Sequence, residues 1–319
     1  MRRGHLPARS YNGSVTQSYD LIVPTTASAP SLYLERSGPL LRFWGLFRQA
    51  CTAAYEDNCF GVAKGVAYSA LLAFFPVLAS IATILAKANA ESVGRVFRRF
   101  LFEVVPPGSE DLVANQFLVT GQRPVWLIVL AAALSVWAAS GAIVSLMEGY
   151  DAAYRLPSGR PFVKQRSVAI LLVFTAALPA IGSSVLILFG ARSERDMLSW
   201  LGIVPGADVK TWMTMLSSAL RYGLALGATV VVTALMYCVA PNRPLKLRAV
   251  WPGSFLATSL WILVTAGFAW YVRNIANYKV LYGSIGAVIA LLVWMYLGAV
   301  ISLIGCEYNA VRERLASEF

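Results

Sequence analysis

The side chains that could do chemistry stand at the ends of long apolar runs. Lys64, Glu148 and Glu307 each border such a run, and Asn309 follows closely after Glu307. A charged group at this position can pair with an opposite charge, bind a polar ligand or control entry into the membrane. We therefore interpret these residues as a candidate polar gate or binding site. The alternative is that each long side chain reaches the aqueous interface without further function, and the sequence leaves both open.

The residues needed for metal or nucleophilic catalysis are scarce. The only histidine is His5, and the four cysteines, Cys51, Cys59, Cys238 and Cys306, have no metal-like spacing. A zinc site, or a Ser/His or Cys/His catalytic centre, therefore lacks its histidine. There is also no GxxxxGK[ST] phosphate-binding loop. We expect no metal, no cofactor, no catalytic residues and no enzyme activity, although chemistry by carboxylates alone is left open.

The composition explains why charged residues are confined to the ends of apolar runs. Of 319 residues, 58% are apolar and 13% are charged, and the mean hydropathy is +0.63. A soluble globular domain carries about 25% charged residues, so this balance indicates a membrane protein that crosses the bilayer several times. The net charge of +11 fits Lys and Arg gathered on the cytoplasmic side. We expect no nucleic acid as a partner.

Six uncharged runs, each long enough to cross a hydrocarbon core of ~30 Å, position these residues. The runs are Gly65–Ala86, Pro124–Met147, Ser167–Ala191, Tyr222–Asn242, Ala249–Val272 and Val280–Cys306. They predict an all-α fold, with six transmembrane helices in one domain over residues 37–319. Pro76 and Pro179 fall inside runs and are candidate kinks, whereas Gly283 and Gly286 are candidates for close packing or a hinge.

The segment before the first run has two parts. Residues 1–36 are polar, and we expect a flexible cytoplasmic tail. After Pro39, one helical face is apolar, and its side chains are Leu40, Trp44, Phe47, Cys51 and Ala54. This pattern predicts an amphipathic helix in the membrane interface, and a soluble helix that packs on loops is the alternative. Residues 93–118, in the first outer loop, are also amphipathic and are interpreted either as a hairpin on the membrane or as a solvated cap.

The distribution of Lys and Arg predicts the orientation. With an even number of spans, both termini lie on one side, and that side receives sixteen of the 27 Lys and Arg residues. Because positive residues accumulate on the cytoplasmic side, we expect both termini in the cytoplasm.

Several stretches resemble the YihY/BrkB family of inner-membrane proteins. They are DNCFGVAKGVAYSALLAFFPVLAS (Asp57–Ser80), EGYDAAYRLPSGRPFVKQR (Glu148–Arg166), APNRPLKLRAVWPGS (Ala240–Ser254), and YGSIGAVIALLVWMYL with GCEYNA (Tyr282–Leu297 and Gly305–Ala310). The resemblance runs from about Ala53 to the C-terminus. It implies a six-helix protein of the bacterial inner membrane with cytoplasmic termini. Asp151 stands where the family often has asparagine, and we add it to the candidate gate residues.

The resemblance also bears on function. An old label of the family, ribonuclease BN, disagrees with this sequence, because that activity needs clusters of metal-binding His and Asp. Proposals for some members involve moving lipids or lipid-linked molecules. Our hypothesis is a permease-like protein that helps a lipid or another amphiphile enter or cross the membrane.

Two other classes of function are kept as alternatives. One is a membrane scaffold or assembly factor without transport of its own, and the other is a membrane-embedded hydrolase. Membrane lipids are the expected partners. A periplasmic or membrane protein partner and a homo-oligomer are left open.

Overall fold

The computed structural model describes residues 38–87, 125–157, 159–178, 181–182, 207–274 and 278–317. The chain divides into two compact units, Met1–Arg42 and Phe43–Phe319. The second unit holds everything below except the first residues of the first helix. The predicted tail over residues 1–36, the amphipathic residues 93–118 and Pro179 lie outside the described residues.

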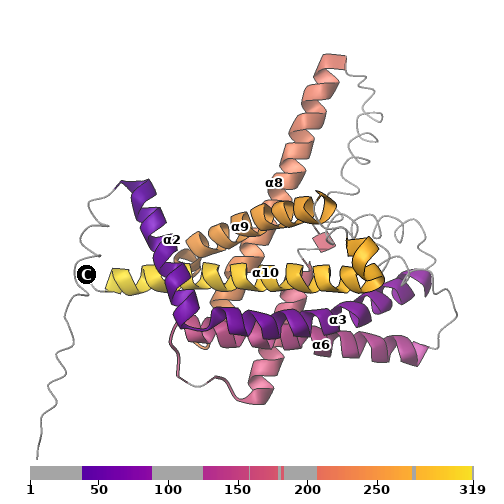
Figure 1. Ribbon diagram of the computed structural model, residues 1–319, viewed down its shortest axis with the longest axis horizontal. Helices are drawn as coiled ribbons and strands as arrows, with labels where there is room; N and C mark the ends of the chain where they lie inside the picture. The colour runs from indigo at the N-terminus through magenta and orange to yellow at the C-terminus, as the bar shows by residue number, and fades with distance from the viewer. Residues whose placement is uncertain are drawn as a thin grey trace, which may run out of the picture. The chain divides into compact units, whose positions relative to one another are not determined.

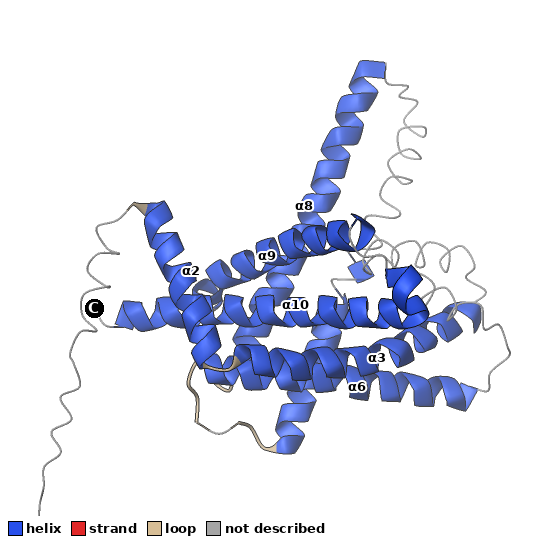
Figure 2. Cartoon of the chain, viewed as in Figure 1, coloured by secondary structure: helices blue, strands red, loops and turns tan. Residues whose placement is uncertain are grey.

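Every regular element in the described residues is a helix (Figure 2). The helices are α2 (Pro39–Glu56), α3 (Cys59–Lys87), α6 (Val125–Ala153), α8 (Ala207–Val239), α9 (Leu247–Asn274) and α10 (Tyr278–Ser317). A further helical segment covers residues 162–178. The predicted all-α fold is confirmed.

Five helices in the described part of the chain are long and apolar enough to cross a membrane. The stretches that qualify are Cys59–Ser80, Val129–Ala153, Met215–Val239, Leu247–Asn274 and Ile285–Ser317. They overlap the first, second, fourth, fifth and sixth predicted spans. The helical segment 162–178 overlaps the third predicted span. The protein is therefore an all-helical membrane protein that crosses the bilayer several times.

The helix ends differ from the predicted span ends. We placed the ends at the first ionisable residue, but α6 continues past Glu148 to Ala153, and α10 continues past Glu307 to Ser317. A helix can extend beyond the hydrocarbon region because its backbone groups are hydrogen-bonded within the helix and need no partner from the bilayer. Glu148 and Glu307 therefore lie within helices and not after them.

The helix α10 is the centre of the packing. It packs against α9, α3 and α6, whereas α8 packs against α9. Figure 1 shows α3 and α6 side by side along α10, and α8 crossing α9 and α10 at a steep angle.

Two glycines allow α9 and α10 to approach closely. A β-carbon at Gly253 would overlap the carbonyl oxygen of Gly305, and a β-carbon at Gly305 would lie 2.7 Å from that of Ala257. Small residues at such contacts let helix backbones pack together in a membrane. Gly283 and Gly286 both lie inside α10, and Gly286 is buried. Their role in packing or bending stays a prediction.

The helix α2 is present as predicted, but its apolar face is divided between two environments. Leu46 and Ala50 pack with Leu256 of α9 and Tyr308 of α10. Ala54 is fully buried, whereas Trp44 is 63% exposed. The predicted apolar face is therefore exposed at Trp44 and buried in the core at Ala54.

Pro76 lies inside α3, where it cannot donate a backbone hydrogen bond. The Ser80 hydroxyl donates to the Pro76 carbonyl at 2.8 Å and lies 3.0 Å from the Ser135 hydroxyl of α6. A polar contact thus links α3 to α6 next to the proline.

Candidate functional site

Glu307 is fully buried, and Arg314 is its cationic partner. The Glu307 side chain is 0% exposed, and its Oε2 lies 3.3 Å from Nη2 of Arg314. The Cys59 thiol of α3 donates to Oε1 at 3.7 Å, and Arg314 also donates to the Ala153 carbonyl at the end of α6, at 2.9 Å. The pair therefore links α10 to α3 and α6. A carboxylate that lost this cation would be left buried and uncompensated.

Asp57 is a second acidic group beside Glu307. It lies in the turn between α2 and α3, where Asn58 has a positive φ of 54°. Asparagine tolerates this left-handed conformation better than most residues. One Asp57 oxygen, Oδ2, is buried and has no hydrogen-bond partner among the described residues.

Lys64 and Glu148 differ from Glu307 in burial. Both side chains are exposed, and the neighbours of Glu148 on α6, Met147 and Gly149, are buried. Among the described ion pairs, neither residue is a partner of Glu307. The structure thus brings Glu307 to Arg314, a residue that was not among the candidates from the sequence. The i, i+7 spacing on one helix was the available signal, because it places both side chains on one face.

Asp151 helps to hold the connection between α8 and α9. Its Oδ1 accepts a hydrogen bond from the Asn242 backbone N–H at 2.7 Å. Arg160, after α6, donates to three carbonyls at the end of α8, those of Val239, Ala240 and Pro241, at 3.0, 3.0 and 2.8 Å. A cation at the C-terminal end of a helix satisfies its free carbonyls and complements its dipole. Arg160 is thus a structural residue that the sequence analysis did not single out.

A second cation in this region rests on an aromatic ring. The Arg243 guanidinium lies 4.7 Å from the ring centroid of Tyr154 and is paired with Glu313. Burial is the main reason that the pKa of Tyr154 lies well above its usual value. Tyr154 is therefore a neutral ring beneath Arg243.

Asn309 uses its whole amide group between α9 and α10. Its Oδ1 accepts from the Gly253 backbone N–H at 2.8 Å, and its Nδ2 donates to the Val250 carbonyl at 3.0 Å. These backbone groups flank Pro252, which interrupts the hydrogen bonding of α9. We call the residues Asp151, Arg160, Glu307, Asn309 and Arg314 the polar rim, because they link the ends of α6 and α8, the start of α9 and the C-terminal part of α10.

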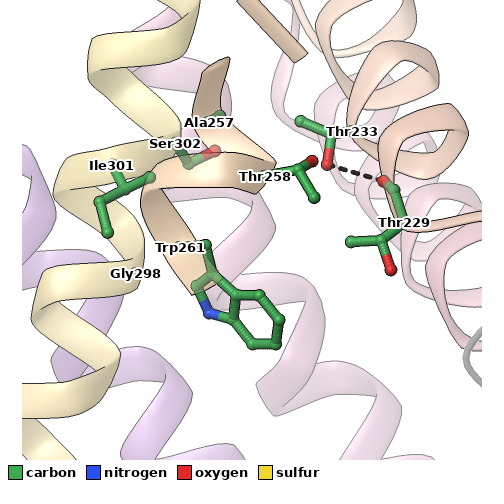
Figure 3. Close-up of a pocket in the computed structure, with 8 residues that line it drawn as sticks. All are labelled: Thr229, Thr233, Ala257, Thr258, Trp261, Gly298, Ile301 and Ser302. Carbon is green, nitrogen blue, oxygen red and sulfur yellow. Dashed lines mark hydrogen bonds between the residues drawn. The ribbon is translucent and has the colours of Figure 1, made fainter. Parts of the chain in front are cut away.

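A cavity of about 200 Å³ lies between α8, α9 and α10, inside the candidate membrane spans. It is lined by Thr229, Thr233, Ala257, Thr258, Trp261, Gly298, Ile301 and Ser302 (Figure 3). At a rise of 1.5 Å per residue, Ser302 is about 7 Å along α10 from Glu307. The cavity is therefore within the membrane and next to the polar rim.

Among the described residues that line the cavity, four carry a hydroxyl group and none is charged, and most of the lining surface is apolar. Figure 3 shows the side chains of Thr233 and Thr258 pointing toward each other across the gap between α8 and α9. Each donates its hydrogen within its own helix, Thr233 to the Thr229 carbonyl and Thr258 to the Ser254 carbonyl, both at 2.9 Å. Their oxygen lone pairs remain free to accept a hydrogen bond.

Two buried tyrosines support the cavity from behind Ser302. The Tyr150 hydroxyl lies 2.6 Å from the Ser302 hydroxyl, and Tyr237 donates to the Ser302 carbonyl at 2.6 Å. The two rings meet edge to face, with centroids 5.4 Å apart. This site was not predicted from the sequence, because its polar groups carry no charge. The pair Thr229 and Thr233, four residues apart on a membrane helix, was the available signal.

Comparison with known proteins gives one consistent family. The virulence factor BrkB family matches residues 50–318 of the chain. The putative ribonuclease-like protein YfkH of Bacillus subtilis is 29% identical over 79% of this chain and 90% of its own length. A UPF0761 membrane protein of Alteromonas mediterranea is 29% identical over 87% of this chain and 90% of its own length. A UPF0761 membrane protein of Pseudoalteromonas translucida is 25% identical over 88% of this chain and 90% of its own length.

No solved structure matches the chain. The family match covers all of the polar rim and all of the residues that line the cavity. Within the described residues, no three His, Cys, Asp or Glu side chains lie together as metal ligands would. The helices, the membrane spans and the sequence match agree, and the chain belongs to the virulence factor BrkB family of membrane proteins.

Proposed function

We propose that the protein is a permease-like protein that helps a lipid or another amphiphile enter or cross the bacterial inner membrane. The observation that supports this most is the hydroxyl-lined cavity between α8, α9 and α10. A polar group inside a bilayer needs partners, and a cavity with hydroxyl groups supplies them at that depth. Such a site would hold the polar part of an amphiphile while its apolar part stays among lipid chains.

The polar rim supplies a candidate gate for this passage. It lies next to the cavity. We propose that this end of the bundle faces the cytoplasm and that both termini of the chain are also cytoplasmic. Lys64 and Glu148, exposed on α3 and α6, belong to the same proposed entrance. Since no phosphate-binding loop is present in the sequence, we propose that a partner protein or a concentration gradient drives the movement.

Reconstitution tests the proposed function. Full-length protein is placed in liposomes that hold fluorescent lipids with charged or uncharged heads, and transbilayer movement is followed by quenching from outside. We expect faster movement of at least one lipid than in empty liposomes. The variant Gly298→Leu places a side chain in the cavity, and the β-carbon of this side chain would have no atom within 4 Å. It should return the rate to that of empty liposomes.

Gly227→Leu is the matched control. This position is also on a membrane helix, is also open within 4 Å, and does not line the cavity. It should keep the rate of the unaltered protein. If the unaltered protein moves no lipid in the panel, either alone or with membrane extract as a source of partners, the proposal is wrong.

A non-transporting scaffold is the second candidate function, and the polar rim supports it. Asn309, Glu307 and Arg314 all use their polar groups to link helices of this chain. A scaffold would tolerate Gly298→Leu in every cellular assay, whereas a permease would not. The same variant therefore separates the two functions.

A further inference from the structure

The cavity between α8, α9 and α10 has a defined chemical preference. We propose that it binds the uncharged, hydroxyl-bearing head of a lipid, while the lipid chains lie outside it along α8. This rests on the proposed function and names the class of ligand for that site. Four properties of the cavity carry it: its size, its free acceptors, its lack of charge and its open side.

The size fits a small polar head. The cavity measures about 200 Å³, and a water molecule in liquid takes up about 30 Å³, so the cavity equals the space of about seven waters. A glycerol-sized group fits this space. A whole lipid does not, and its chains must stay outside.

The wall accepts hydrogen bonds and therefore selects a donor. The hydroxyl hydrogens of Thr229, Thr233 and Thr258 all go to carbonyls of their own helices, at 3.0, 2.9 and 2.9 Å. The free lone pairs of these oxygens face a ligand. A ligand hydroxyl can donate to them, whereas an ether or an ester oxygen cannot.

The described part of the wall has no group that would compensate an ionic head. The eight lining residues that the structure describes are uncharged, and the cavity lies inside the candidate spans. A phosphate or an ammonium group placed there would lose its hydration without gaining an opposite charge, which is strongly unfavourable. An uncharged donor is the remaining class.

The exposure of the threonines gives the direction of entry. Thr258 is 3% exposed and lies at the inner end of the cavity. Thr233 is half-buried, and Thr229 is exposed on α8. The polar wall thus extends from the core to the side surface of α8, where lipid chains would lie. We propose that a head enters sideways from the bilayer along these threonines, which replace part of the hydrogen bonding that it loses on leaving water.

Photocrosslinking tests this proposal directly. Full-length protein in nanodiscs is irradiated with a diazirine-labelled diacylglycerol, and the labelled peptides are identified by mass spectrometry. We expect labelling on α8, α9 and α10 around the cavity. Unlabelled 1,2-dioleoylglycerol should compete about tenfold better than its 3-O-methyl ether, since one hydrogen bond is lost. Phosphatidic acid should compete no better than the ether.

Two variants and one control locate the site. Thr258→Val keeps the shape and removes one hydroxyl, and Gly298→Leu fills the space; both should reduce labelling about tenfold or more. Thr175→Val is the matched control, because Thr175 makes the same type of bond, to the Leu171 carbonyl at 2.9 Å, outside the cavity. It should leave labelling unchanged. Each variant is first shown to elute as one peak at the position of the unaltered protein.

A second source of the same chemistry is a long isoprenoid alcohol. Undecaprenol competing better than dioleoylglycerol would keep the hydroxyl class and assign the head to an isoprenoid. Three results would each overturn the proposal: equal competition by the methyl ether, stronger competition by phosphatidic acid, or labelling that neither Thr258→Val nor Gly298→Leu changes.

If labelling behaves as expected but no lipid moves in liposomes, the cavity is a binding site and the transport proposal fails. If lipids move and labelling ignores both variants, transport stands and this site is wrong.

Discussion

At the scale of single residues, the buried carboxylate of Glu307 has a structural partner on its own helix. Arg314 lies two turns further along α10 and is 34% exposed, whereas Glu307 is 0% exposed. The two residues therefore respond differently to removal. A half-exposed cation can be hydrated after it loses its partner, but a fully buried carboxylate cannot.

This asymmetry leads to the first prediction. Arg314→Met should lower the free energy of unfolding by about 3 kcal/mol, whereas Glu307→Gln should lower it by about 1 kcal/mol. Thermal unfolding in detergent, followed by size-exclusion chromatography, measures both. Arg312→Met is the control, because Arg312 is exposed on the same helix. Equal losses of unfolding free energy for the two variants would show that the burial of Glu307 does not decide the cost of breaking the pair.

A second residue-scale prediction concerns Arg160. It donates to three carbonyls at the end of α8, so Arg160→Ala should free the last turn of that helix. We expect local opening to become easier by about 2 kcal/mol, the size of hydrogen bonds to a charged group. Hydrogen exchange of peptides that cover residues 235–243 measures this. Lys164→Ala, at an exposed position, should leave the exchange unchanged, and an equal effect there would contradict the role of Arg160.

At the scale of elements, the contact between α9 and α10 depends on the absence of side chains. Gly253 and Gly305 face each other so closely that a β-carbon on either would overlap its neighbours. The Asn309 amide then bridges the two helices beside this contact. The same two helices form two walls of the cavity, so their spacing also sets the shape of the proposed binding site.

Gly305→Ala is the prediction at this scale. Alanine normally favours a helix over glycine by about 1 kcal/mol, but here it should destabilise the protein by about 2 kcal/mol through overpacking. Gly227→Ala, with no atom within 4 Å, should be neutral or stabilising. The two melting temperatures, compared with that of the unaltered protein, decide the matter: a stable Gly305→Ala protein would mean that the helices separate at no cost.

At the scale of the whole molecule, the orientation in the membrane is the property with the largest consequences. If both termini are cytoplasmic, the polar rim and the cavity next to it open toward the cytoplasmic leaflet. The charge distribution supports this, because sixteen of the 27 Lys and Arg residues lie on the side of the termini.

Fusion proteins test the orientation. A fluorescent protein fused after Phe319 should be bright, because it folds in the cytoplasm, and alkaline phosphatase fused there should be inactive. Alkaline phosphatase fused after Asn274, between α9 and α10, should be active, because it would be exported. The opposite pattern would place the cavity near the outer leaflet, and a lipid would then enter from the outer leaflet and not from the cytoplasmic one.

The sequence predicted the elements of the fold better than it predicted the site. Uncharged runs of more than twenty residues can only be membrane helices, so their number and class followed from composition. That the polar residues at their ends form a gate or binding site stays a prediction. The partners of these residues were not predicted: Glu307 pairs with Arg314, and Asn309 with backbone groups beside Pro252. Pairing depends on which helices touch and in what rotation, and a single sequence does not specify either.

The sequence by itself therefore determined the properties that follow from the order of residues along the chain. These are the class of all-helical membrane protein, the spans, the family resemblance and the charge asymmetry. The tertiary structure alone decided that Glu307 is buried, that Lys64 and Glu148 are exposed and that Thr229, Thr233 and Thr258 share a cavity with Ser302. The physical reason is that hydrophobicity is a property of each residue along the chain. A cavity exists only where three helices cross, and the steep crossing of α8 over α9 and α10 (Figure 1) is set by the side chains of all three together.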